Sequence, residues 1–326
     1  MPYDLSKLLV VAISSTALFD NRTEHEIYLT QSLDRYVKYQ IDHEDQPFPA
    51  GTALPLIRAL LQLNDLNPEK RLVEVVILSK MEPAAGIRVM NSVEHHNLDI
   101  VRAAFTGGEL VAKYLSAYNV TLFLSTNEDD VKDALERGVA AGLLYDPPSN
   151  KNEDLEQLRI AFDGDAVIFS DEAEQVYQEK GIEAFYEHEK ANAEKPLPEG
   201  PFASFLRAIA KIQKDHKGQG KNGFPPIQTA LVTARNSPAH KRVILTLRAW
   251  GIEIDEMFFL GGVAKDQVLK AFNAHIFFDD QDSHALLASQ HVPAARVPNT
   301  VSKGKKVEDD SNQLNLPLFN DGKPDQ

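Results

Sequence analysis

The chain contains no cysteine, and it has few basic residues for its number of acidic ones. The absence of cysteine excludes disulfide bonds, thiolate metal ligands and cysteine nucleophiles, and it agrees with a reducing cytoplasmic location. With 34 basic against 48 acidic residues, the formal charge is −14. A chain this acidic is a poor candidate for direct nucleic-acid binding, which needs a basic face. Any anionic substrate therefore needs a local source of positive charge, such as a metal ion.

Long apolar runs are also absent, since none approaches the roughly 18 residues of a membrane span. The apolar segment 8–13 follows Lys7 and loosely resembles a signal peptide. However, Asp4 precedes it, and no small-residue cleavage site follows before Asp20. We therefore expect this segment to be a buried β-strand and the protein to have no membrane partner.

Two halves of the chain resemble each other at a fixed spacing. Three segments recur at an offset of 154 residues, namely 75–79 with 229–233, 105–108 with 259–262, and 122–126 with 276–280. Upstream the offset falls to 149, and an insertion of five residues near 214–222 explains the difference. Ungapped matches of this kind argue against chance similarity, and the period is too long for a solenoid repeat. They predict a duplicated unit, with residues 1–150 and 151–297 as its two copies.

Each half alternates short apolar runs with helical patterns. The runs are 8–13, 73–78 and 121–124 in the first half, and 158–162, 229–232 and 275–278 in the second. This alternation predicts an α/β fold with parallel sheets and helices on both faces. Because ligands of such sheets bind at the carboxyl ends of the strands, we expect the polar residues after these runs to share a crevice.

The second half places carboxylates at these strand ends. Asp163 and Asp165 follow one buried run two residues apart, and Asp279 and Asp280 end another. Four carboxylates form an all-oxygen site of the kind that Mg²⁺ prefers. A carboxylate such as Asp163 is a competent nucleophile toward phosphorus, and Asp165 is placed to protonate the leaving oxygen.

Three further positions supply groups for a phosphate. Thr233 and the amides of Ala234 and Arg235 follow a third run, at a strand-to-helix turn where amides point at anions. Lys265 supplies the positive charge that the chain otherwise lacks. Each piece alone has a simpler explanation as a turn, a helix cap or a solvated side chain. Their order at four strand ends favours a common site.

This ordered set resembles the haloacid dehalogenase superfamily, whose motifs are a D-x-D-x-[TV], a Thr or Ser, a Lys and an acidic pair after successive strands. The resemblance covers residues 158–297 and implies a Rossmann-like fold. More closely, residues 161–167, 233–240 and 277–281 resemble the cytosolic 5′-nucleotidase I family, and residues 105–108 of the first half also fit. That resemblance implies a magnesium-dependent hydrolase of nucleoside monophosphates, AMP in particular.

The resemblance also assigns roles to residues. It makes Asp163 the nucleophile and Asp165 the acid and base, with Thr233 and Lys265 contacting the phosphate. It makes Asp279 and Asp280 the acids on the metal side, and it leaves open which of the two binds the metal. The segment 171–221 lies where relatives carry a helical cap over the substrate. For its aromatic residues, packing in the core is favoured over stacking on a base: Tyr177, Phe185, Tyr186 and Phe202.

The first half departs from this pattern. Residues without charge replace the nucleophile, the acid, the lysine and the acidic pair: Ser14, Thr16, Val111, Ser125 and Thr126. We interpret the first half as a catalytically inactive copy. It either supports the fold or lends residues to the nucleoside pocket, for which the candidates are Arg88, Asn91, His95 and His96.

The end of the chain is polar from residue 298 to residue 326, and we expect it to be disordered. Within it, the segment from Gln313 to Phe319 resembles the peptide with which bacterial proteins dock on the DNA polymerase sliding clamp. A chance match is the favoured alternative, since short motifs recur by accident. Two other functions stay open: a phosphatase of another small phosphomonoester, and a nucleotide-sensing or clamp-associated binding protein. A homo-oligomer is also left open.

Overall fold

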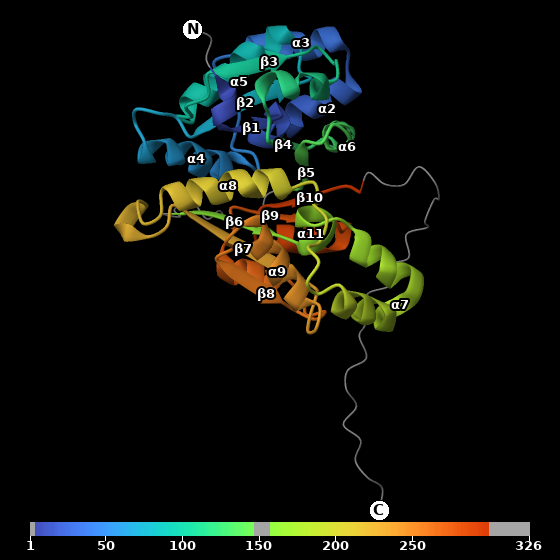
Figure 1. Cartoon of the computed structure of the whole chain (residues 1–326). Helices are drawn as coiled ribbons and strands as arrows, with labels where there is room; N and C mark the ends of the chain where they lie inside the picture. Colours follow the sequence, from blue (N-terminus) through green and yellow to red (C-terminus); the bar gives the residue numbers. More distant parts are fainter. Residues whose placement is uncertain (1–3, 147–156, 300–326) are drawn as a thin grey trace, which may run out of the picture.

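The protein, described here by a computed structural model, forms one sheet of ten strands that runs through both halves of the chain (Figure 1). The structure describes residues 4–146 and 157–299, so the expected boundary at residue 150 and the segment from Gln313 to Phe319 lie outside the described residues. The strands are β1 (Leu9–Ile13), β2 (Val73–Ser79), β3 (Arg102–Phe105), β4 (Leu122–Ser125), β5 (Ala140–Leu144), β6 (Leu158–Phe162), β7 (Ile227–Thr233), β8 (Glu256–Phe259), β9 (Ile276–Asp279) and β10 (Ala294–Arg296). Their order across the sheet is β3-β2-β1-β4-β5-β10-β9-β6-β7-β8.

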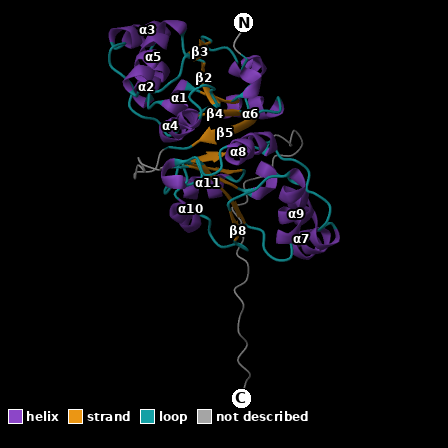
Figure 2. Cartoon of the chain, turned by 60° about the vertical axis from the view of Figure 1, so that its left-hand side comes forward, coloured by secondary structure: helices purple, strands orange, loops and turns teal. Residues whose placement is uncertain are grey.

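Helices cover both faces of this sheet (Figure 2). They are α1 (Ser15–Leu18), α2 (Arg22–Thr30), α3 (Leu33–Asp42), α4 (Leu54–Gln62), α5 (Gly86–His95), α6 (Glu128–Glu136), α7 (Glu172–Ala191), α8 (Ala203–Asp215), α9 (His240–Trp250), α10 (Asp266–Phe272) and α11 (Asp282–Ser289). All strand pairs are parallel except β5 with β10. The expected α/β fold is thus confirmed. Among the residues that the structure describes, no helix combines the length and apolar composition needed to span a bilayer.

The strands are apolar on both faces because both faces are covered. Every residue of β1, β2 and β9 is buried, so the first of these is the buried strand expected for residues 8–13. Alternate side chains enter different cores: Val11 and Ile160 belong to one core that spans both halves. Ala12 and Ala161 point the other way, into two smaller cores, one for each half.

The two halves have the same strand order. The order β3-β2-β1-β4-β5 in the first half corresponds to β8-β7-β6-β9-β10 in the second. Backbone conformations recur as well, since Asn119 and Asn273 both end a short helical turn in the left-handed region, with φ of 53° and 59°. Gly108 and Gly262 both have φ of 90°. These are the sequence positions that match at an offset of 154.

The halves meet where β5 and β10 pair in antiparallel register, with Leu144 opposite Ala295. Gly142 is required there, because a Cβ atom at this position would lie 2.9 Å from the Cβ of Ala295. Beside the junction, the Tyr145 hydroxyl donates a hydrogen bond of 2.5 Å to Asp282. The pairing therefore joins the strands of the two halves into one continuous sheet.

The expected cap at residues 171–221 consists of two helices with different surroundings. In α8, Phe205, Leu206 and Ile209 are fully buried in the core that spans both halves. Helix α7 buries only Ala173, Phe185 and Glu189, and it bends at Gly181, where φ is 81°. The first half has the same layout, with α2 and α3 at the positions of α7 and α4 at those of α8. The segment is therefore part of the shared plan of both halves, and only α7 lies beside the candidate site.

Candidate active site

The carboxyl end of β6 turns sharply toward that of β7. After Asp163, residues Gly164–Ile168 form a tight turn in which Ala166 adopts the left-handed region, with φ of 57°. A Cβ atom on Gly164 would lie 3.4 Å from the Thr233 hydroxyl, so the two strand ends are in contact. A left-handed alanine costs about 1 kcal/mol, and such strain is concentrated at functional sites.

Lys265 lies between two carboxylates at the centre of the site. Its Nζ atom is 2.8 Å from Asp163 Oδ1 and donates a hydrogen bond of 2.7 Å to Asp279 Oδ2. All three side chains are buried. Burial alone lowers the pKa of Lys265, but the two carboxylates outweigh this effect and raise it, so the ammonium stays charged. The carboxyl ends of β6 and β9 thus place Asp163 and Asp279 together with Lys265.

Asp163, Asp279 and Asp280 form a carboxylate cluster, with one oxygen of each lying within 4.8 Å of the others. Burial raises the pKa of Asp163 to about 6, opposed by Lys265 and reinforced by Asp279. Burial, Asp279 and Asp163 also raise the pKa of Asp280 well above its ordinary value. Three carboxylates against one ammonium leave an excess of negative charge, which a cation would neutralise.

Asp165 lies apart from this cluster. Arg235 occupies both of its oxygens, with Nε 2.8 Å from Oδ2 and an Nη atom 2.6 Å from Oδ1. The Asp165 carboxylate is thus outside the cluster of Asp163, Asp279 and Asp280, and its role as a metal ligand stays a prediction. The reason for its position is the guanidinium of Arg235, whose planar fork pairs with both oxygens of a carboxylate at once.

A buried chain of charges ties this pair to helix α7. Glu189 of α7 accepts hydrogen bonds from Arg235 on one oxygen and from Arg242 of α9 on the other, the latter at 2.8 Å. Nothing in the local pattern of either helix indicated this contact. A comparison of the halves contains the signal: Glu189 corresponds to Gln40, and Arg235 corresponds to Met81. The first half thus lacks counterparts of Glu189 and Arg235 but keeps one of Arg242, namely Arg88.

The predicted phosphate contacts lie beside the cluster. Thr233 is buried, and its hydroxyl accepts a hydrogen bond of 3.2 Å from the Arg235 amide. Ala234 lies between them, at the carboxyl end of β7. The contact of Thr233, Ala234 and Arg235 with a phosphate stays a prediction. The side chain of Arg235 has a separate role, since it holds Asp165.

The candidates from the first half serve its own packing. Arg88 is buried and donates hydrogen bonds to Glu24 at 2.7 Å and to Gln40 at 3.1 Å. Asn91 donates to a backbone carbonyl in the same half, at 2.8 Å. The ring of His95 packs edge-on against that of His96, with ring centroids 5.1 Å apart. We therefore leave these residues out of the substrate site proposed below.

The aromatic residues expected in the cap also pack within the protein. Phe202 is fully buried and contacts Phe278, with ring centroids 4.6 Å apart. Phe185 lies under the guanidinium of Arg235, whose central carbon is 5.6 Å from the ring centroid. Tyr177 and Tyr186 pack against Phe185 in the same small cluster.

Comparison with known proteins agrees with this geometry. Residues 1–304 match the model of a family described as 5′-nucleotidase. The chain belongs to the 5′-nucleotidase family. It is 36% identical over 282 residues to human cytosolic 5′-nucleotidase 1B, which confirms the family resemblance noted in the sequence. This match covers 85% of the chain and 46% of the relative, so the chain spans about half the length of that curated protein.

Among solved structures, a chain from the Pnkp1/Rnl/Hen1 complex is similar at 10% identity. The match covers 91% of this chain and 99% of that chain, with a TM-score of 0.31. A score this low carries no argument about fold or function.

Proposed function

We propose that this protein is a magnesium-dependent 5′-nucleotidase that hydrolyses nucleoside 5′-monophosphates, with AMP as the expected substrate. The observation that carries the proposal is the position of Lys265, in contact with both Asp163 and Asp279 within a buried carboxylate cluster. Membership of the 5′-nucleotidase family supports the substrate class. The order of motifs supports a haloacid dehalogenase-like mechanism, and the name of the human relative supports a cytoplasmic location.

The donor set fits magnesium. Asp163, Asp279 and Asp280 offer only carboxylate oxygens, which suit a hard divalent cation rather than zinc or copper. The raised pKa of Asp280 indicates that its charge lacks sufficient compensation from the protein alone. Bound there, the ion would neutralise the charge of the phosphoryl group.

In the proposed reaction, a carboxylate oxygen of Asp163 attacks phosphorus while the bond from phosphorus to the 5′ oxygen breaks. This step forms an aspartyl-phosphate and releases the nucleoside, whose 5′ oxygen receives a proton from Asp165. Asp165 then removes a proton from the water that attacks the aspartyl-phosphate. Inorganic phosphate leaves, and the Asp163 carboxylate is regenerated. Lys265 holds Asp163 in place and stabilises the negative charge on the phosphoryl oxygens.

This role of Asp165 requires its pair with Arg235 to open. Both carboxylate oxygens are occupied by the guanidinium, so no oxygen is free to carry a proton toward the substrate. Because Arg235 also contacts Glu189, movement of α7 would pull on the pair. We propose that closure of α7 over the substrate releases Asp165 for proton transfer.

The test is phosphate release from AMP in the presence of Mg²⁺. The Asp163→Asn variant should lose activity by at least about a thousandfold, because an amide is not a nucleophile toward phosphorus. A matched control is Glu253→Gln, which removes a carboxylate whose side chain is 94% exposed and to which the proposal assigns no role. Equal activity of Asp163→Asn and the wild type would refute the assignment.

A panel of substrates separates the alternatives. Faster hydrolysis of sugar phosphates than of AMP would favour a phosphatase of another small phosphomonoester. Tight AMP binding without turnover would favour a nucleotide-sensing or clamp-associated protein. The docking of residues 313–319 on a sliding clamp is tested by pulldown with the purified clamp, and self-association by sedimentation of the full chain.

A further inference from the structure

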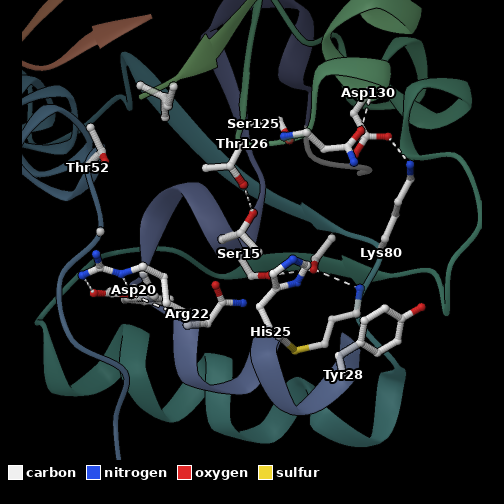
Figure 3. Close-up of a pocket in the computed structure, with 18 of the residues that line it drawn as sticks. Ser15, Asp20, Arg22, His25, Tyr28, Thr52, Lys80, Ser125, Thr126 and Asp130 are labelled. Carbon is white, nitrogen blue, oxygen red and sulfur yellow. Dashed lines mark hydrogen bonds and ion pairs between the residues drawn. The ribbon is translucent and has the colours of Figure 1, made fainter. Parts of the chain in front are cut away.

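The first half contains a cavity of about 950 Å³ at the carboxyl ends of β1, β2 and β4 (Figure 3). This is the position that corresponds to the carboxylate cluster of the second half, since β1, β2 and β4 match β6, β7 and β9. Loss of the catalytic residues has therefore not closed the pocket. A volume of this size is sufficient for a small-molecule ligand.

Hydroxyl groups form the floor of the cavity. The Thr16 hydroxyl lies 2.6 Å from that of Thr126, and the Ser15 hydroxyl lies 2.7 Å from that of Ser79. Thr16 and Thr126 stand where the second half has Asp165 and Asp280. The floor therefore has no charge with which to hold a metal ion, but it offers donors and acceptors to a hydroxylated ligand.

The charged groups of the lining disfavour an anion. Arg22 donates to Asp20 at 2.9 Å, and Lys80 lies 2.6 Å from Asp130, so both cations of the lining are already paired. Figure 3 shows these two pairs on opposite sides of the cavity. Other carboxylates line it as well, which leaves four acids against two cations. A phosphate group would meet repulsion without a free cation to offset it.

Aromatic rings form a further part of the lining. His25 and Tyr28 of α2 stack with ring centroids 6.5 Å apart, and Tyr36 of α3 meets Tyr28 edge-on at 5.6 Å. Tyr28 is 52% exposed, so its ring is accessible to a ligand in the cavity. The exposed rings of His25 and Tyr28, together with the hydroxyl floor, suit a flat heterocycle joined to a sugar.

We propose that this cavity binds an uncharged nucleoside, with its base on the His25 and Tyr28 rings and its sugar on the hydroxyl floor. The choice of a nucleoside among ring-and-hydroxyl ligands rests on the proposed function, which releases one. The first half then acts as a second binding site, for the product of the second half.

The test is calorimetric titration of the full chain with adenosine. The Tyr28→Ala variant should bind adenosine about fivefold to a hundredfold more weakly, the range expected for loss of one base–aromatic stack. Thr126→Val should also weaken binding, because it keeps the shape of the side chain and removes a hydroxyl. The matched control is Leu29→Ala, since Leu29 neighbours Tyr28 on α2, is 67% exposed and does not line the cavity. It should bind as the wild type does.

A second series separates this proposal from the proposed function. Asp163→Asn, which should abolish phosphate release, should keep the Tyr28-dependent adenosine binding. In this inactive variant, adding Tyr28→Ala should leave the affinity for AMP unchanged. Adenosine binding that is unaffected by both Tyr28→Ala and Thr126→Val would overturn the proposal, as would Tyr28-dependent AMP binding as tight as that of adenosine. Failure of AMP hydrolysis with intact Tyr28-dependent adenosine binding would refute only the proposed function.

Discussion

Replacing Glu189 by glutamine, the residue at the corresponding position of the first half, should strongly destabilise the second half. Glu189 is fully buried and neutralises Arg235 and Arg242 together. Removing one partner of a buried ion pair typically costs 3–5 kcal/mol, because the other charge is left uncompensated. Asp165 still pairs with Arg235, and glutamine keeps a hydrogen-bond acceptor. We therefore expect a loss of about 3 kcal/mol in the free energy of unfolding, at the low end of that range.

The first half also supplies the compensating change. Arg88, the counterpart of Arg242, donates to Gln40 and is neutralised by Glu24, and Met81 stands in place of the second arginine. The double variant Glu189→Gln with Arg235→Met copies Gln40 and Met81, although Ala173 stays where the first half has Glu24. Its loss of stability should be smaller than the sum of the two single losses by about 2 kcal/mol, as is typical of directly coupled residues.

Urea unfolding followed by circular dichroism measures these free energies. The control is Glu187→Gln, an exposed position on the same helix, which should change stability by less than about 0.5 kcal/mol. Additive losses in the double variant would show that Arg235 and Glu189 are not energetically coupled, and the proposed link between α7 and Asp165 would then fail.

Three further predictions concern the site and its surroundings. Lys265→Met should reduce phosphate release by about a hundredfold or more, measured against Lys270→Met on the exposed side of α10. Mg²⁺ should raise the melting temperature of the wild type but not that of Asp280→Asn, and chelation of the ion should reverse the effect and abolish activity. Burial lowers the pKa of His275 from 6.5 to about 4, so the unfolded chain binds its proton first as the pH falls. The free energy of unfolding should therefore fall as the pH drops below 6.5. Its decrease between pH 7 and pH 5 should be about 2 kcal/mol smaller in His275→Asn than in the wild type. Equal pH dependence of the two proteins would contradict the neutral buried state of this histidine.

The sequence pattern predicts the position of a site residue where that position follows from the direction of the strands. Parallel strands bring their carboxyl ends to one edge, so Asp163, Asp279 and Lys265 were expected together and lie together. The α/β fold followed from buried apolar runs, as in β1 and β9. The equal strand order of the halves agrees with the spacing of their matching segments.

Other contacts depend on tertiary structure that no local pattern contains. The direction of Asp165 is set by the left-handed Ala166 that follows it and by an arginine on another strand end. The contact of Glu189 with Arg235 depends on where α7 lies after its bend at Gly181. Arg88 donates to Glu24 and Gln40, and a buried arginine on a helix has the same local sequence signature whether it contacts a ligand or packs within its own half.

The antiparallel pairing of β5 with β10 has a consequence for any attempt to divide the protein. Separated from each other, the two halves would each expose one of these strands as an open edge, with unpaired amide and carbonyl groups. The close fit at Gly142, which leaves no room even for a methyl group, would also be lost. A fragment with either half alone should therefore self-associate through this edge or aggregate, because each half covers the open edge of the other.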